Sequence, residues 1–175
     1  SNGVFRVGSG SNTFIGPISL VAGSSNAFDM ASGTTLLVPN GIAGDGTLSK
    51  INSGTLVLTG PNNWTGGSYV TGGILQLGNG GTSGNLPGDV FLTATLSFLR
   101  SDAVTYSGNV SGGGTVQHSS GSGPVILAGT NVGVNLFLAS GNLASPLTLA
   151  GTSSNVFGYV NVGRTPSSAL TIQPG

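Results

Sequence analysis

The sequence lacks cysteine and glutamate, and only eight of its 175 residues carry a charged side chain. Without cysteine, the chain forms no disulfide scaffold and no thiolate zinc site. The charges of one lysine and three arginines are balanced by those of four aspartates, so the chain lacks the excess of basic residues that nucleic-acid binding requires. Long helices are disfavoured too, because each of the 33 glycines would cost a helix interior about 1 kcal/mol relative to alanine.

Long apolar runs and targeting signals are also missing. No stretch reaches 18 consecutive apolar residues, so we expect no membrane-spanning helix. Residues 1–6 lack the basic and apolar regions of a signal peptide, so an export signal is expected outside this chain. Charge runs and proline-rich linkers are absent as well, and residues 1–175 are interpreted as a single domain.

Glycine, serine, threonine and asparagine make up just over half of the chain, a composition that often indicates disorder. However, 37% of the residues are apolar, and they occur in short β-branched or leucine-rich runs such as residues 55–58. These runs predict an ordered all-β chain with turns of Gly, Asn, Ser and Pro. The predicted strands are 4–7, 18–21, 35–38, 47–50, 55–59, 74–77, 90–93, 96–99, 104–106, 115–118, 125–128, 136–138, 147–150, 159–162 and 170–172.

Short strands at this spacing fit a sandwich, a barrel or a solenoid, and internal similarity favours the solenoid. Residues 53–60 resemble residues 122–129, and residues 44–48 resemble residues 112–116. Both pairs are separated by nearly the same distance, and we interpret this period of about 70 residues as three coils of roughly 20–25 residues. The prediction is a right-handed parallel β-helix of about seven to eight coils, roughly 35–40 Å long at ~4.8 Å per coil.

Alternation along the strands predicts which side chains form the core. The residues expected to stack inward are Leu56, Leu58, Leu75, Leu77, Val125 and Leu127. Those expected outward or at corners are Thr55, Val57, Gln76 and Ile126. Stacked Asn, Ser and Thr side chains are expected to form hydrogen-bonded ladders along the axis.

Residues 46–81 carry a recognisable series of motifs. A Gly-Thr-Leu strand is followed by Ser-Gly-Thr-Leu-Val-Leu-Thr-Gly at 53–60, the turn Asn-Trp-Thr-Gly-Gly at 63–67, and Gly-Ile-Leu-Gln-Leu-Gly at 73–78. This series resembles the autotransporter-associated β-strand repeat, also called the passenger-associated transport repeat, and the resemblance extends over residues 46–116. It implies a β-helix in a bacterial secreted or surface protein. It carries over no catalytic residues.

The chain offers little chemistry for an enzyme. His118 is the only histidine, and its alignment with Lys50 leads us to expect it at an outward strand end. Asp89 and Asp102 are the best pair for a glycosidase or lyase. Arg100, two residues from Asp102, is more simply explained as its partner in a surface ion pair, and Asp45 and Asp89 as turn residues. We therefore expect no catalytic site, no metal site and no cofactor.

Four aromatic residues are candidates for a glycan-stacking surface. These are Trp64, Tyr69, Tyr106 and Tyr159. The alternative is that these rings cap turns or pack in the core.

Both ends of the sequence are strand-like, and neither carries a polar cap. The candidate residues for self-association along the axis are Val4, Phe5, Val7, Leu170 and Ile172. Two explanations fit: a piece of a longer passenger, or copies that stack head to tail into a filament.

The sequence favours a non-enzymatic structural element outside a bacterial cell, secreted or on its surface, and the expected partner is a second copy of the chain. An adhesin module that binds glycans or another cell surface is the first alternative. A carbohydrate-active β-helix enzyme is the second.

Overall fold

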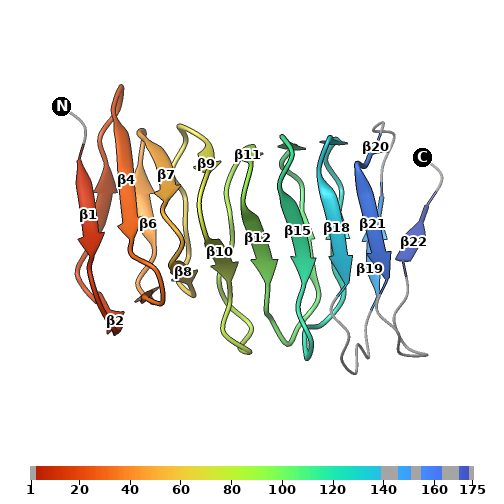
Figure 1. Ribbon diagram of the computed structural model, residues 1–175, viewed down its shortest axis with the longest axis horizontal. Coiled ribbons are helices and arrows are strands. Elements are labelled where there is room, and N and C mark those ends of the chain that lie inside the picture. The colour runs from red at the N-terminus through yellow and green to blue at the C-terminus, as the bar shows by residue number, and fades with distance from the viewer. Residues whose placement is uncertain (1–2, 139–145, 151–154, 163–169, 174–175) are drawn as a thin grey trace.

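The computed structural model describes residues 3–138, 146–150, 155–162 and 170–173. Within these residues every regular element is a β-strand, and strands of successive coils pair in parallel. The strands stack side by side along the long axis of the molecule, from the N-terminal to the C-terminal end (Figure 1), in about seven turns. The predicted all-β parallel solenoid is therefore confirmed.

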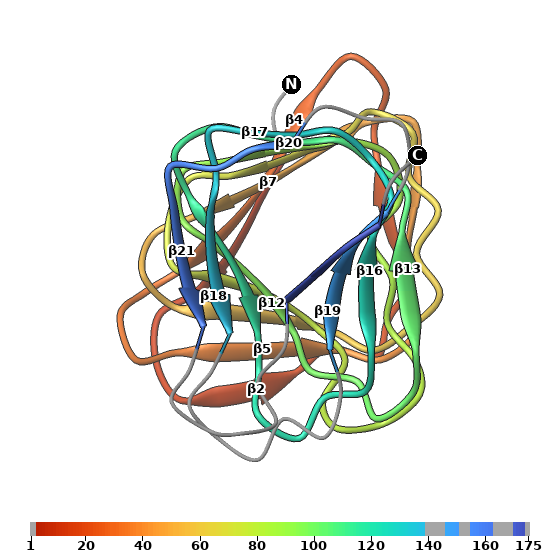
Figure 2. The same cartoon turned by 90° about the vertical axis from the view of Figure 1, so that its right-hand side faces the viewer.

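The solenoid is right-handed, as predicted. Figure 2 views it from the C-terminal end, with β16 (Val125–Leu127) on the right, β17 (Asn131–Val132) at the top and β18 (Asn135–Leu138) on the left. The chain thus runs anticlockwise while it advances toward the viewer. This is the hand that twisted parallel strands favour in their crossover connections.

Two sheets run the length of the solenoid. The first sheet contains, in order, β1 (Val4–Val7), β4 (Ser25–Met30), β7 (Thr47–Ile51), β9 (Ser68–Val70), β11 (Val90–Leu92), β14 (Val110–Ser111), β17 and β20 (Asn155–Val156). The second contains β2 (Ser11–Thr13), β5 (Thr35–Val38), β8 (Thr55–Leu58), β10 (Ile74–Leu77), β12 (Thr95–Phe98), β15 (Thr115–His118), β18 and β21 (Tyr159–Val162).

The third side of the solenoid is built in two parts. Strands β3 (Ile18–Leu20) and β6 (Ile42–Gly44) form one short sheet, and β13 (Val104–Tyr106), β16, β19 (Leu147–Leu149) and β22 (Leu170–Ile172) form the other. Residues 59–67 and 78–89, all of which the structure describes, lie between them and form no strand.

Asparagine side chains replace strand pairing in that gap. The backbone N–H of Ile42 donates to Asn62 Oδ1 at 2.8 Å, and the N–H of Asn62 donates to Asn85 Oδ1 at 2.7 Å. The two side-chain amides also donate reciprocally to the Asn62 and Asn85 carbonyls, each at 2.8 Å. This is the predicted ladder. It satisfies backbone groups that would otherwise be unpaired.

The period of about 70 residues is wrong as a structural unit, although the coil length of about 20–25 residues is close to what the structure shows. Thr55 pairs with Ile74 in the next coil and Asn135 with Tyr159, so the coils differ in length. The matched segments 53–60 and 122–129 lie in different sheets, since the first contains β8 and the second β16. Two segments separated by about 70 residues therefore lie on neighbouring sides of the solenoid. Their sequences are similar because all sides have the same inward and outward alternation.

All fifteen predicted strands are present, with ends that differ by one residue at most. Seven further strands were not predicted: 11–13, 25–30, 42–44, 68–70, 110–111, 131–132 and 155–156. Most of these are short or rich in Ser and Asn, so they have little strand signal of their own. They become strands because the coils on either side supply hydrogen-bonding partners.

The six predicted core residues are all buried, with at most 1% of their surface exposed. Thr55, Gln76 and Ile126 are half-buried on the outer side, as expected. Val57 also points outward and lies outside the core cluster, yet it is only 5% exposed. Its neighbours in the outward row, Leu37 and Gln76, flank it on both sides. These two side chains cover Val57, so Val57 is buried without belonging to the core.

Candidate functional site

The four candidate aromatic residues do not form one surface. Trp64 and Tyr106 are buried, with 1% and 4% of their surfaces exposed. Tyr69 and Tyr159 are exposed, at 49% and 62%, but they belong to the first and second sheets respectively. Burial excludes Trp64 and Tyr106 from stacking on a ligand.

Trp64 fixes the turn that precedes β9. Its indole Nε1–H donates to the Gly67 carbonyl at 3.1 Å and to Ser68 Oγ at 3.2 Å. A Cβ on Gly66 would lie 2.5 Å from the backbone of Gly46 in the previous coil. Gly67 has a φ of 77°, which favours glycine. The Trp-Thr-Gly-Gly motif is thus a packing requirement between coils.

Tyr106 is similarly structural. Its ring lies 6.3 Å from that of Phe98, and its hydroxyl donates to the Gly88 carbonyl at 2.6 Å. Burial raises the pKa of the Tyr106 phenol well above its usual range, and the carboxylate of Asp89 adds to the effect. This side chain stays protonated and holds the turn before β11.

Tyr69 has an exposed aromatic neighbour that was not predicted from the sequence. Strand pairing sets Phe91 of β11 directly beside Tyr69 of β9, and the ring centroids lie 6.0 Å apart with an interplanar angle of 46°. Phe91 is 42% exposed. A signal was present in the sequence, because each ring sits between two inward residues in the triplets Ser68–Val70 and Val90–Leu92. The sequence did not reveal the coil length, which is needed to align the two triplets.

A polar ladder borders this aromatic pair. Asp89 accepts hydrogen bonds from the backbone N–H of Asn109 at 2.8 Å and from its Nδ2 at 3.2 Å. Asn109 Oδ1 in turn accepts from the backbone N–H of Thr130 at 2.9 Å. Asp89 is exposed and lies in the turn before β11, as predicted.

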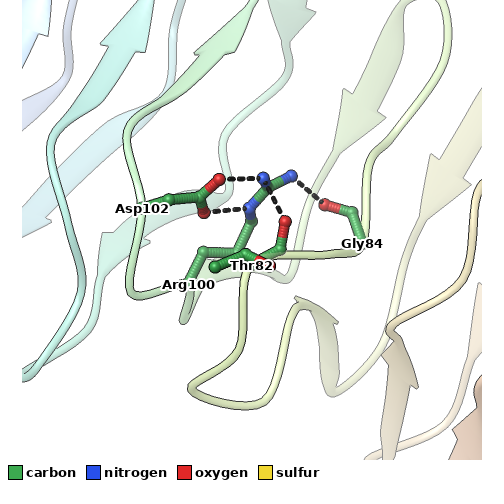
Figure 3. Close-up of polar contacts among 4 residues, drawn as sticks. All are labelled: Thr82, Gly84, Arg100 and Asp102. Carbon is green, nitrogen blue, oxygen red and sulfur yellow. Dashed lines mark hydrogen bonds and ion pairs between the residues drawn. The ribbon is translucent and has the colours of Figure 1, made fainter.

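The predicted Arg100–Asp102 ion pair is confirmed. Arg100 Nε and Nη2 donate to the two carboxylate oxygens of Asp102 at 2.9 and 2.7 Å. Figure 3 shows the same guanidinium donating to the carbonyls of Gly84, at 2.8 Å, and Thr82, at 2.6 Å. The hydrogen bond from Arg100 lowers the pKa of Asp102. This arrangement pins the loop after β10 and leaves the Asp102 carboxylate bound to a cation.

Lys50 points into the solenoid. His118, which aligns with Lys50 in the sequence, also points inward, so the expectation that His118 lies at an outward strand end is wrong. Lys50 is fully buried, and its Nζ donates to the carbonyls of Ile51, Asn52 and Gly72 at 2.9, 2.7 and 2.9 Å. Burial lowers the pKa of Lys50 to about 8, although the negative charge of Asp29 opposes this shift. Asp29 itself accepts from Asn52 at 2.6 Å and pairs with Arg6 at 2.8 Å, contacts that lower its pKa.

His118 is also fully buried, in the row of inward residues between Phe98 and Leu138. Its Nε2 lies 2.9 Å from the Gly123 carbonyl and therefore carries the proton, whereas the buried Nδ1 has no hydrogen-bonding partner. Burial lowers the pKa of His118, and the hydrogen bond to Gly123 only partly offsets this effect. The side chain is neutral and sealed from solvent, so it has no access to a substrate.

Titratable groups do not gather into a metal site in the part of the chain that the structure describes. No group of three or more His, Cys, Asp or Glu side chains occurs there. Among the same residues, no helix is long and apolar enough to cross a membrane.

The candidate axial residues lie at the two ends of the stack (Figure 1). Val4 is 58% exposed and Phe5 is half-buried, but Val7 is buried and presents no surface for an axial contact. At the other end Ile172 is 71% exposed although it continues the inward row of Leu127 and Leu149. Leu170 is half-buried.

Comparison with known families and proteins agrees with the motifs. The model of the passenger-associated-transport-repeat family matches residues 48–77, which run from β7 to the end of β10. This segment is similar to the passenger-associated transport repeat, in agreement with the resemblance seen in the sequence. The matched stretch is shorter than the predicted 46–116. In structural terms the repeat holds two neighbouring strand pairs, β7–β9 and β8–β10, joined by the Trp64 turn.

The chain is also similar to a curated protein, the Adhesin BmaC autotransporter of Brucella suis biovar 1 (strain 1330). The two sequences are 47% identical over 83 residues, which cover 46% of this chain and 2% of the relative. No solved structure matches the chain significantly.

Proposed function

We propose that this chain is a non-catalytic segment of a bacterial surface passenger, acting as a rigid stalk within an adhesin. The observation that carries the proposal is the unbroken parallel pairing of eight strands in each of the two long sheets, combined with the transport repeat and the similarity to an autotransporter adhesin. Each coil adds about 4.8 Å, so eight stacked strands extend a stalk by roughly 34 Å.

The placement of the charged residues supports a non-catalytic role. Glycoside hydrolysis requires two carboxyl groups facing one substrate. Here Asp102 is bound by Arg100, Asp89 by Asn109 and Asp29 by Arg6 and Asn52. Asp45 accepts from Thr65 at 3.0 Å. Each carboxylate therefore has its own structural partner.

Surface display tests the proposal. The chain, with an N-terminal epitope tag, is fused ahead of an autotransporter translocator in a Gram-negative host, and antibody binding is measured on intact cells. We expect the tag to be exposed on cells carrying the native sequence. Leu75→Asp, which places a charge in the core, should abolish display, whereas Gln76→Glu on the outer side of the same strand should not. A native chain retained inside the cell would overturn the proposal.

The ends of the stack support a second candidate function, which is axial self-association. Ile172 and Val160 continue inward rows yet are 71% and 38% exposed. At the opposite end, hollows of about 430 and 190 Å³ adjoin the Phe5 ring. Sedimentation of the purified chain should show association that rises with concentration and is lost in Ile172→Lys. A native chain that sediments as a monomer at every concentration would contradict it.

A further inference from the structure

We propose that the outer face of the first sheet at β9 and β11 is a carbohydrate-binding surface centred on Tyr69 and Phe91. This inference rests on the adhesin function proposed above and names the class of ligand that one face of the stalk would bind.

The aromatic pair is the first observation. Tyr69 and Phe91 project from directly paired positions of adjacent strands, and 49% and 42% of their surfaces are exposed. The core does not require apolar side chains in this outward row. The residues paired with Tyr69 and Phe91 on the neighbouring strands are the polar Ser49 and Ser111. The negatively polarised faces of aromatic rings attract the C–H groups of a sugar ring.

The polar residues next to the two strands are the second observation. Asp89 and Thr93 adjoin the two ends of β11, and Thr71 directly follows β9. All three are exposed. The Asp89 carboxylate has about four acceptor positions and Asn109 occupies two, so two remain for sugar hydroxyls. Asn109 holds the carboxylate in a fixed orientation before any ligand arrives.

Size and charge together indicate the occupant. An aromatic side chain covers about 150–250 Å², so the exposed parts of Tyr69 and Phe91 amount to roughly 140–230 Å². A stable protein interface needs about 800 Å² per partner. The face suits one or two sugar rings. The charged group at the start of β11, the Asp89 carboxylate, is an acceptor for neutral hydroxyl groups and repels anions such as nucleic acid.

Saturation-transfer NMR tests the proposal on the purified chain. The probes are cellotetraose, mannotetraose and chitotetraose, and dissociation constants come from titrating the backbone amides of Tyr69 and Phe91. We expect at least one tetrasaccharide to bind. Phe91→Ala and Tyr69→Ala should each weaken that binding by roughly fivefold. Asp89→Asn should weaken it while leaving the aromatic contact in place.

Phe137→Ala is the matched control, because Phe137 is a 37% exposed ring on the outer side of β18 in the other long sheet. It should bind the same tetrasaccharide with unchanged affinity. Emission from the buried Trp64 reports whether each variant is folded. The proposal is overturned if none of the three tetrasaccharides binds, or if Phe137→Ala weakens binding as much as Phe91→Ala.

The display experiment separates this inference from the stalk function. If the native chain binds sugar, and the double variant Tyr69→Ala, Phe91→Ala is displayed normally but binds none, both proposals hold. If the native chain is displayed and binds no sugar, the stalk survives and the carbohydrate surface does not.

Discussion

His118 should make the stability of this protein depend on pH just below neutrality. The imidazole is fully buried and neutral, with Nε2 bound to Gly123 and Nδ1 unpartnered. Because burial lowers its pKa in the folded state, the unfolded chain takes up a proton first as the pH falls. The stability contributed by neutral His118 is therefore complete above the unfolded pKa of about 6.5 and declines below it.

The magnitude follows from proton linkage. If the folded protein stays unprotonated, lowering the pH from 7.5 to 5 reduces the free energy of unfolding by up to about 2 kcal/mol, at ~1.4 kcal/mol per pH unit below the unfolded pKa. The pKa values of Asp29 and Asp102 are lowered, so these carboxylates lose their stabilising effect only at more acidic pH. Lys50, with a pKa of about 8, lies on the alkaline side of this range.

Urea denaturation followed by fluorescence provides the measurement, because Trp64 is the only tryptophan and is buried. The native chain should lose stability between pH 7.5 and 5, and His118→Leu should be nearly independent of pH. Gln117→Leu, on the outer side of the same strand, should keep the native pH dependence. The reasoning is refuted if the native chain is equally stable at both pH values, or if His118→Leu retains the same slope.

Three further variants test other parts of the structure by the same denaturation assay. Gly66→Ala should reduce stability by about 1–3 kcal/mol, since its Cβ would overlap the Gly46 backbone, while Gly81→Ala, with nothing within 4 Å, should be neutral. Leu75→Ala should cost about 2–5 kcal/mol as a fully buried side chain, and a loss equal to that of Gln76→Ala would contradict the assigned register. The lowered pKa of Lys50 means that the native chain should gain roughly 1–2 kcal/mol from pH 8 to 9.5, as the folded state loses its buried proton first; Lys50→Met should lack this gain.

The short apolar runs and the turn residues between them determined the all-β class, and alternation within the runs determined much of the core. Inward and outward positions alternate whatever lies above or below a strand, so Leu56 with Leu58 and Leu75 with Leu77 could be assigned from the sequence. The same rule would have placed Lys50 beside buried Leu48, and His118 beside buried Val116, on the inner side. At these two positions alternation predicts the orientation better than the preference of charged and imidazole side chains for the outside. Backbone carbonyls inside the solenoid bind both side chains.

Only the tertiary structure decided which strands become neighbours. Coil length varies along the chain, and this variation in the loops shifts every later strand, so no fixed period aligns Tyr69 with Phe91. Segments such as Ser68–Val70 and Asn131–Val132 are strands only because adjacent coils pair with them. Local sequence thus determines which side chains face inward or outward, whereas hydrogen bonding between coils determines which outward side chains share a surface.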